Sequence, residues 1–152
     1  MPGTLFRGDR AVVALSVMLD VAFHCGRAQV VSAGDIADRL GLARRGMEPL
    51  LQALSRERLL DSVRGPRGGY RLGRPAREIT LAEIVTAATG QETVAADAPR
   101  GDLHAVAVGP FWQEMERMLW HRLANLALSD LIRRAEADGL RRPAREPISY
   151  AI

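Results

Sequence analysis

Two short strand-like runs, 59–63 and 70–72, flank the loop of Val63-Arg64-Gly65-Pro66-Arg67-Gly68-Gly69-Tyr70. Glycine reaches positive φ without a Cβ clash and proline fixes one φ, so these residues predict a hairpin turn. Arg64 and Arg67 are expected at its tip, exposed and always charged. The loop therefore predicts a small β-hairpin that carries two cations at its end.

Helical patterns precede the hairpin. Apolar spacing predicts one helix over 9–25, and Ser32 and Gly41 are the expected caps of a second, short helix. A third helix should begin near Arg45 or Gly46, because Pro49 is tolerated only in a first turn. Its buried stripe is expected to be Met47, Leu50, Leu51 and Leu54. A helix pair followed by an arginine-tipped hairpin is the outline of a winged helix-turn-helix, a nucleic-acid-binding shape.

Positive charge is concentrated in this part of the chain. The net charge is only +3, and all 21 basic residues are arginine. Residues 39–78 hold ten arginines against four acidic residues, a net charge of +6, whereas the remainder holds eleven against fourteen, a net charge of −3. This distribution fits an electrostatic footprint for phosphates. The alternative is an arginine-rich coding bias on a solvated face.

Residues after the hairpin predict an appendage. Thr80 and Glu83 form a capping box before a helix over 81–88, which closes a DNA-binding domain at 1–89. We expect a loop at 90–109, one helix over 110–139 opened by Pro110, and a flexible tail at 140–152. The long helix carries an apolar stripe that predicts pairing with a second copy, or else packing on the first helix of the same subunit. The stripe is Trp112, Met115, Leu119, Leu123, Leu126 and Leu131.

Composition excludes several classes of protein. The 152 residues, 47% of them hydrophobic, suffice for one compact domain with an appendage, and no run approaches the roughly 20 apolar residues of a membrane span. No secretory signal is visible and Cys25 is the only cysteine, which predicts a cytoplasmic protein. The chain has no lysine for a P-loop and no nucleophile–base pair, so we expect no enzyme. Cys25 is read as a small buried hydrophobe or as a redox switch.

The segment from Arg7 to about Ala88 resembles the Rrf-two family of bacterial winged-helix transcription regulators. The resemblance is carried by Ile36-Ala37-Asp38, by 47–54, by the wing motif over 59–72, and by Ile79-Thr80 with Ile84-Val85. The stretch from Trp112 to Ile132 is similar to the dimerisation helix of the family. The resemblance implies a mainly α fold with a β-hairpin wing and a long C-terminal dimerisation helix. It also implies a homodimer that binds a partly palindromic double-stranded DNA operator, usually as a repressor.

The resemblance has two departures. Members that sense redox state or nitric oxide hold an iron–sulfur cluster with three cysteines in the loop before the long helix, and 90–109 contains none. We therefore expect neither a cluster nor any other cofactor. Gly46 stands where the family usually has an aromatic residue, whereas Glu48 matches a position that faces the DNA groove. Glu48 is expected either to select bases or to pair locally with Arg44 or Arg45.

The expected DNA contacts fall into two groups. The first surrounds the start of the third helix and enters the major groove: Arg44, Arg45, Gly46, Glu48 and Gln52. The second is the wing tip, which reaches the minor groove or its phosphates: Arg64, Gly65 and Arg67. Two other readings remain open. One is a protein-interaction module that regulates an enzyme or an assembly, and the other is a regulator that senses thiol oxidation or a small molecule.

Overall fold

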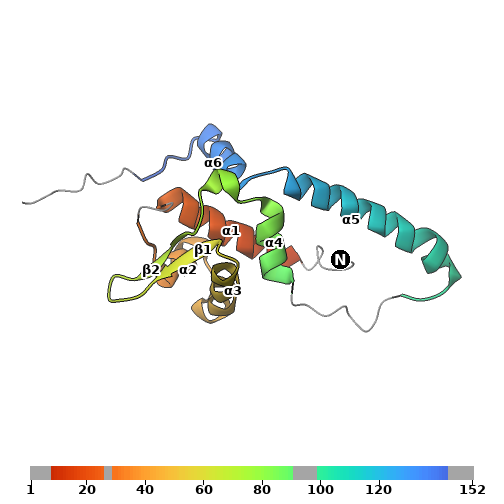
Figure 1. The fold of residues 1–152 in the computed structure, drawn as a ribbon, viewed down its shortest axis with the longest axis horizontal. Helices are drawn as coiled ribbons and strands as arrows, with labels where there is room; N and C mark the ends of the chain where they lie inside the picture. Colours follow the sequence, from red (N-terminus) through yellow and green to blue (C-terminus); the bar gives the residue numbers. More distant parts are fainter. Residues whose placement is uncertain (1–7, 26–28, 91–98, 144–152) are drawn as a thin grey trace, which may run out of the picture.

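The computed structural model describes residues 8–25, 29–90 and 99–143, and Figure 1 shows their arrangement. Helices dominate, and the strands form one antiparallel hairpin. The winged helix comprises α1 (Gly8–His24), α2 (Ala33–Leu40), α3 (Arg44–Arg56), β1 (Leu60–Val63), β2 (Gly69–Leu72), the 3-10 turn η1 (Ala76–Glu78) and α4 (Leu81–Thr89). A π-helical turn η2 (His104–Val108), α5 (Gly109–Ala124) and α6 (Leu128–Ala137) follow.

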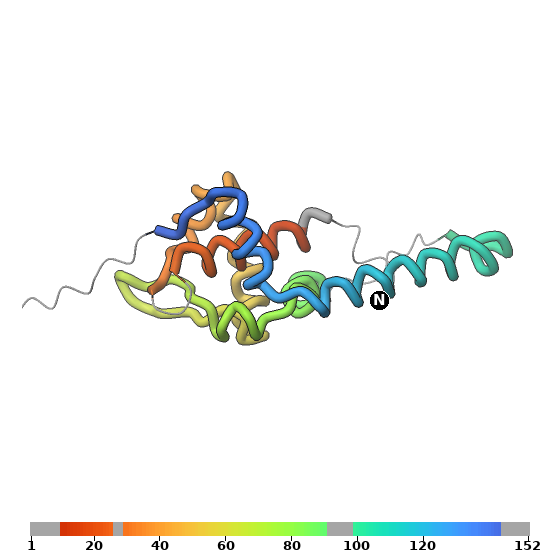
Figure 2. Tube along the Cα trace, turned by 90° about the horizontal axis from the view of Figure 1, so that it is seen from above, coloured from red at the N-terminus to blue at the C-terminus, as the bar shows by residue number. Residues whose placement is uncertain are grey.

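α1 lies at the centre of the core. One of its faces is almost fully buried, and α1 packs on α2, α4, α6 and β2. Figures 1 and 2 both show α5 extending away from this body. At 1.5 Å per residue α5 is about 24 Å long. In the part of the chain that the structure describes, no helix has the length and apolarity to cross a membrane.

The helix pair is fixed by its caps and by one buried charge. The Ser32 hydroxyl accepts from the Asp35 N–H at 3.0 Å, and Gly41 adopts φ 65° at the other end of α2. Arg39 donates two hydrogen bonds to the buried Asp20 carboxylate of α1, at 2.9 and 2.7 Å. The predicted caps are therefore confirmed, and the Arg39–Asp20 pair ties α2 to the central helix.

α3 begins at Arg44, so Pro49 lies in its second turn. The expectation that Pro49 would occupy the first turn is wrong. Proline in a helix interior costs about 3 kcal/mol, whereas each buried apolar side chain contributes about 1.5–3 kcal/mol. Pro49 is exposed, and the stripe of the same helix is buried as predicted: Met47, Leu50, Leu51 and Leu54. Burial of this stripe outweighs the missing hydrogen bond.

Close backbone approaches explain the glycines of the wing. β1 and β2 pair with Val63 opposite Gly69, and Val31 adds a third short edge through reciprocal hydrogen bonds with Tyr70 at 2.9 and 2.8 Å. A Cβ at Gly69 would run into the Val31 carbonyl, and one at Gly68 into the Val63 carbonyl. Gly65 adopts φ 117° at the turn. The hairpin prediction is confirmed, and most of its glycines serve backbone packing.

The region expected to form one helix over 110–139 forms two. The chain leaves the helix after Ala124, and its backbone pairs with the segment before α4: the Leu81 N–H donates to the Leu126 carbonyl at 2.9 Å, and the Leu128 N–H to the Ile79 carbonyl at 2.8 Å. Leu128 is then fully buried in the core. A continuous helix would leave the Leu81 N–H and the Ile79 carbonyl without these partners and Leu128 outside the core, so the prediction of one unbroken helix over 110–139 is wrong.

The boundaries of the neighbouring segments also differ from the prediction. Residues 102–108 are helical, although they lie in the expected loop 90–109, and they continue directly into α5. Residues 91–98 of that loop lie outside the described residues. In the expected tail 140–152, the described residues 140–143 are exposed and non-helical. The rest of that tail also lies outside the described residues.

The capping box of α4 is confirmed. The Glu83 carboxylate accepts from the Thr80 N–H at 2.8 Å, and the Thr80 hydroxyl accepts from the Glu83 N–H at 3.2 Å. Partial burial acts to raise the pKa of Glu83. Hydrogen bonds from Thr80 and Arg74 outweigh burial and hold this pKa below its ordinary value. Glu83 is therefore a carboxylate at neutral pH, and its interactions stabilise the fold until the pH falls through that lowered pKa.

We expect Gly69→Ala to lower the free energy of unfolding by about 1–3 kcal/mol, because the added Cβ meets backbone that has no room to move. Gly46→Ala is the matched control. A Cβ there meets nothing within 4 Å, and alanine in a helix should add about 0.5–1 kcal/mol relative to glycine. Urea denaturation measures both. A Gly69→Ala protein as stable as Gly46→Ala would contradict this account of the wing.

Candidate nucleic-acid interface

α3 presents one face to the core and the other to solvent. The predicted contact residues of this helix all lie on the exposed face: Arg44, Arg45, Gly46, Glu48 and Gln52. In Figure 1, α3 and the hairpin loop lie on the side of α1 opposite α6. The fold therefore leaves the polar face of α3 uncovered, next to the wing.

Arg44 bridges the two helices of the pair. Its guanidinium lies 3.6 Å from the Asp38 carboxylate, and a Cβ built on Gly34 would sit 3.1 Å from it. The Arg44 side chain is 70% exposed and that of Asp38 is 72% exposed. An ion pair so open to water contributes little, typically under about 1 kcal/mol. Arg44 is therefore loosely held, close to the first turn of α2.

Arg45 and Glu48 make no ion pair within the described residues. The alternative of a local pair between Glu48 and either Arg44 or Arg45 is thus not formed. Gly46 is exposed, and a Cβ there would meet open space. The start of α3 therefore offers a cation, an anion and a bare stretch of backbone to whatever approaches it.

The wing tip carries two further free cations. Arg64 and Arg67 are exposed and have no acidic partner in the described part of the chain, with Gly65 between them at the turn. Lower on the hairpin, Arg71 pairs with Asp61 across the strands at 2.8 Å. The basic segment thus divides into paired and unpaired arginines.

Half of the arginines in the basic segment 39–78 form ion pairs with acidic side chains: Arg39, Arg44, Arg71, Arg74 and Arg77. Within the described residues, its unpaired members are Arg45, Arg56, Arg58, Arg64 and Arg67. The unpaired set includes the helix start and both wing-tip positions. The sequence gives the number of charges in this segment, but no sequence pattern indicates which arginines are paired with acidic side chains in the folded chain.

Cys25 lies at the end of α1. Its thiol donates to the Val21 carbonyl at 3.4 Å. Burial raises the pKa of Cys25, an effect that the nearby Arg39 partly opposes. A raised pKa lowers the fraction of thiolate, which is the form that reacts with oxidants. The surroundings of Cys25 resemble those of a small buried hydrophobe more than those of a reactive thiol.

The predicted dimerisation residues divide between the core and solvent. Leu123, Leu126 and Leu131 pack against the core of their own chain, whereas Met115 is 39% exposed. Trp112 and Leu119 are half-buried. Five further apolar side chains are exposed on the same appendage: Leu103, Val106, Val108, Phe111 and Met118. Leu103, Val106 and Val108 precede Pro110, and their apolar spacing could have indicated a helix there. Small and polar neighbouring residues favoured a loop instead.

The chain is similar to known transcription regulators. Residues 8–134 match the family Rrf2 (Rrf-two), described as an iron-dependent transcriptional regulator. The HTH-type transcriptional regulator IscR of Photorhabdus laumondii is 35% identical over 135 residues, which cover 81% of this chain and 76% of the relative. The solved structure of T. potens IscR superimposes with a TM-score of 0.68 at 25% identity, covering 90% of this chain and 92% of that one. Staphylococcus aureus CymR superimposes with a TM-score of 0.64 at 28% identity, covering 80% and 93%.

An iron–sulfur cluster does not fit the donors of this chain. Such clusters are held mainly by about four cysteine thiolates, and the chain has one cysteine. That thiol is engaged with the backbone of its own helix. Across residues 8–25, 29–90 and 99–143, no three His, Cys, Asp or Glu side chains are grouped to hold a metal ion.

Proposed function

We propose that this chain, which belongs to the Rrf2 family of transcriptional regulators, acts as a homodimer that binds a partly palindromic operator and represses transcription. The chain is a DNA-binding transcription regulator rather than an enzyme. The assignment of particular residues to DNA, the dimer and the sign of regulation are the proposed parts. The observation that carries the DNA contacts is the set of free cations on the exposed start of α3 and at the wing tip. The dimer rests on the exposed apolar face of α5, and repression rests on the family resemblance.

The proposed mechanism uses two grooves. The start of α3 enters the major groove, where Arg45 approaches base edges or phosphates and Gly46 lets the backbone come close. Glu48 selects bases by accepting from a cytosine amino group, because an acid beside phosphate otherwise costs affinity. Arg64 and Arg67 reach the minor groove or its phosphates. Arg44 and Gln52 flank these contacts.

The proposed dimer follows from the apolar surface of the appendage. Phe111 is 57% exposed, Met115 39% and Met118 60% on α5, and these positions share one helix face by their spacing. Exposed large apolar side chains that gather on one face mark an interaction site. A second copy covers this face with an identical one, which matches the two-fold symmetry of a palindrome. Operator half-sites should then lie roughly 34–36 Å apart, or a multiple of that.

This proposal places the protein in the cytoplasm, with access to DNA, and assigns no role to Cys25. A thiol switch there remains the less favoured alternative, because burial raises the pKa of the thiol. A protein-interaction module that does not read DNA is also less favoured. Arg45, Arg64 and Arg67 are free cations on the start of α3 and on the wing, and such cations fit the phosphates of DNA.

The wing is tested by replacing both arginines of its tip. Arg64→Ala with Arg67→Ala should weaken binding to all DNA sequences and reduce the slope of log K against log salt by about 2, one unit for each lost phosphate contact. The control is the neutral replacement Asp61→Asn with Arg71→Gln, which removes an existing ion pair and should leave the slope unchanged. Electrophoretic mobility shift across salt concentrations measures it. An unchanged slope in the tip variant removes the wing from the interface.

Glu48 is tested through preference rather than affinity. Glu48→Ala should change the DNA sequences recovered by selection, because alanine cannot accept a hydrogen bond from the amino group of a cytosine at that position. Affinity for the best site should change less than preference does, because the lost contact to a cytosine is offset by the removal of an acid that stands beside phosphate. Selection and sequencing of bound DNA compares the two proteins. Recovery of the same operator by both would sink the selective role.

The dimer is tested on the exposed face of α5. Met118→Glu should raise the dimer dissociation constant on the order of 100-fold, because an unpaired carboxylate would be buried between apolar surfaces. Gln113→Glu adds the same charge on the opposite side of the helix and should leave the dimer intact. Sedimentation velocity measures both. A Met118→Glu protein that dimerises like the parent chain would place the interface elsewhere.

A further inference from the structure

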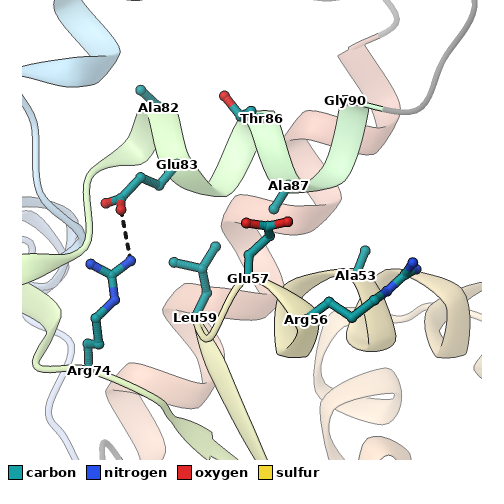
Figure 3. Close-up of a pocket in the computed structure, with 10 residues that line it drawn as sticks. All are labelled: Ala53, Arg56, Glu57, Leu59, Arg74, Ala82, Glu83, Thr86, Ala87 and Gly90. Carbon is teal, nitrogen blue, oxygen red and sulfur yellow. Dashed lines mark hydrogen bonds and ion pairs between the residues drawn. The ribbon is translucent and has the colours of Figure 1, made fainter.

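We propose that the groove between the C-terminal end of α3 and α4 binds a small zwitterion of the α-amino-acid class with an apolar side chain, and that its occupancy alters DNA binding. The groove has a volume of about 530 Å³. That volume is in the range of small-molecule sites, about 300–1,000 Å³. Figure 3 shows α4 above it and the end of α3 below it. The regulatory half of this inference rests on the proposed function, whereas the binding half does not.

The middle of the groove is apolar. Leu59 is 1% exposed and forms part of its floor, and the half-buried Ala53, Ala82 and Ala87 line its sides. The alanines on both facing helices have short side chains, which leaves the middle of the groove open. This part of the groove therefore suits a small apolar group.

The Arg74–Glu83 pair closes one side of the groove and is already satisfied. Arg74 donates to Glu83 at 2.8 Å and to the Glu78 carbonyl at 3.1 Å. Glu83 in turn accepts from the Thr80 N–H. Arg74 and Glu83 neutralise each other and bond to backbone groups of the same chain, so the pair leaves no unpaired charge for a ligand.

Two other charges that line the groove are free. Arg56 and Glu57 are both exposed, and neither has an ion-pair partner in the part of the chain that the structure describes. In Figure 3 the Glu57 carboxylate points toward α4 near Ala87, while Arg56 extends along α3 past Ala53. One free carboxylate and one free guanidinium beside an apolar floor complement a ligand with an ammonium, a carboxylate and a small apolar side chain.

The groove lies where a bound ligand would affect DNA binding. One wall is the end of α3, whose start carries the proposed DNA contacts, and the other is α4. α4 also packs on α1 and α5. A ligand held between Glu57 and α4 favours one separation of α3 and α4, and it shifts the DNA-binding equilibrium by its preference for that arrangement.

The binding half is tested on the full chain without DNA. The probes are L-alanine, L-valine, L-leucine, L-methionine and L-phenylalanine, each titrated to about 20 mM while amide resonances are followed by NMR. At least one should shift resonances of 53–59 and 82–90 in a saturable way. Its amine and its carboxylic acid analogues, each lacking one charge, should bind at least about tenfold more weakly. If none of the five probes shifts these resonances, the proposal is overturned.

Matched variants locate the two charges. Glu57→Gln and Arg56→Gln should each weaken the binding amino acid by at least about tenfold, because each removes a charge-assisted hydrogen bond. Arg58→Gln is the control, since Arg58 is exposed and unpaired as well but does not line the groove. Unchanged binding by Glu57→Gln and Arg56→Gln would overturn the assignment to this groove.

The regulatory half is tested with selected operator DNA. Operator affinity, measured by fluorescence anisotropy with and without a saturating amino acid, should change at least about fivefold in the parent chain and not in Glu57→Gln. Saturable binding with no change in operator affinity would overturn the coupling and leave the site intact. Failure of the chain to bind any DNA would instead count against the proposed function.

Discussion

The burial of α1 is the interaction on which the other elements depend. Ala14, Val17, Met18 and Val21 are fully or almost fully buried, and α1 contacts α2, α4, α6 and β2. Apolar burial contributes about 25 cal/mol for each Å² removed from water, so a helix covered on several sides is a large part of the total. α3 packs mainly on α2, α4 and β1 rather than on α1. That arrangement leaves the outer face of α3 for another molecule.

The arginines differ in whether an acidic side chain pairs with them. Asp20 is buried, and a bidentate bond to Arg39 compensates its charge and joins α2 to α1. Removing one partner of such a pair is costly, so Arg39 belongs to the fold rather than to DNA. Arg71 and Arg74 are likewise engaged. Among the arginines that remain unpaired, Arg45 lies at the start of α3 and Arg64 and Arg67 at the wing tip, whereas Arg56 and Arg58 lie at the other end of α3.

The absence of a thiolate set changes how this regulator is expected to sense its signal. Its single cysteine leaves no cluster site in the sequence. The groove between α3 and α4 lies within the winged helix, between the helix that we propose reads DNA and the helix that packs on α5. Backbone hydrogen bonds between 126–128 and 79–81 join the segment after α5 to the start of α4.

Local patterns in the chain were sufficient to predict the winged helix. Caps at Ser32, Gly41 and Thr80, the apolar stripe of α3 and the glycine-rich loop each act within a few residues, and all appear as expected. The start of α3 was predicted slightly too late because the cost of Pro49 in a helix can be seen in the local sequence. The burial of the apolar stripe that outweighs this cost depends on tertiary contacts. The break at 125–127 arises from backbone bonds to residues about 45 positions earlier, and no short-range pattern records such a partner. For the same reason, charge counts located the basic segment, but only the folded chain separates the arginines that acids neutralise from those that remain free.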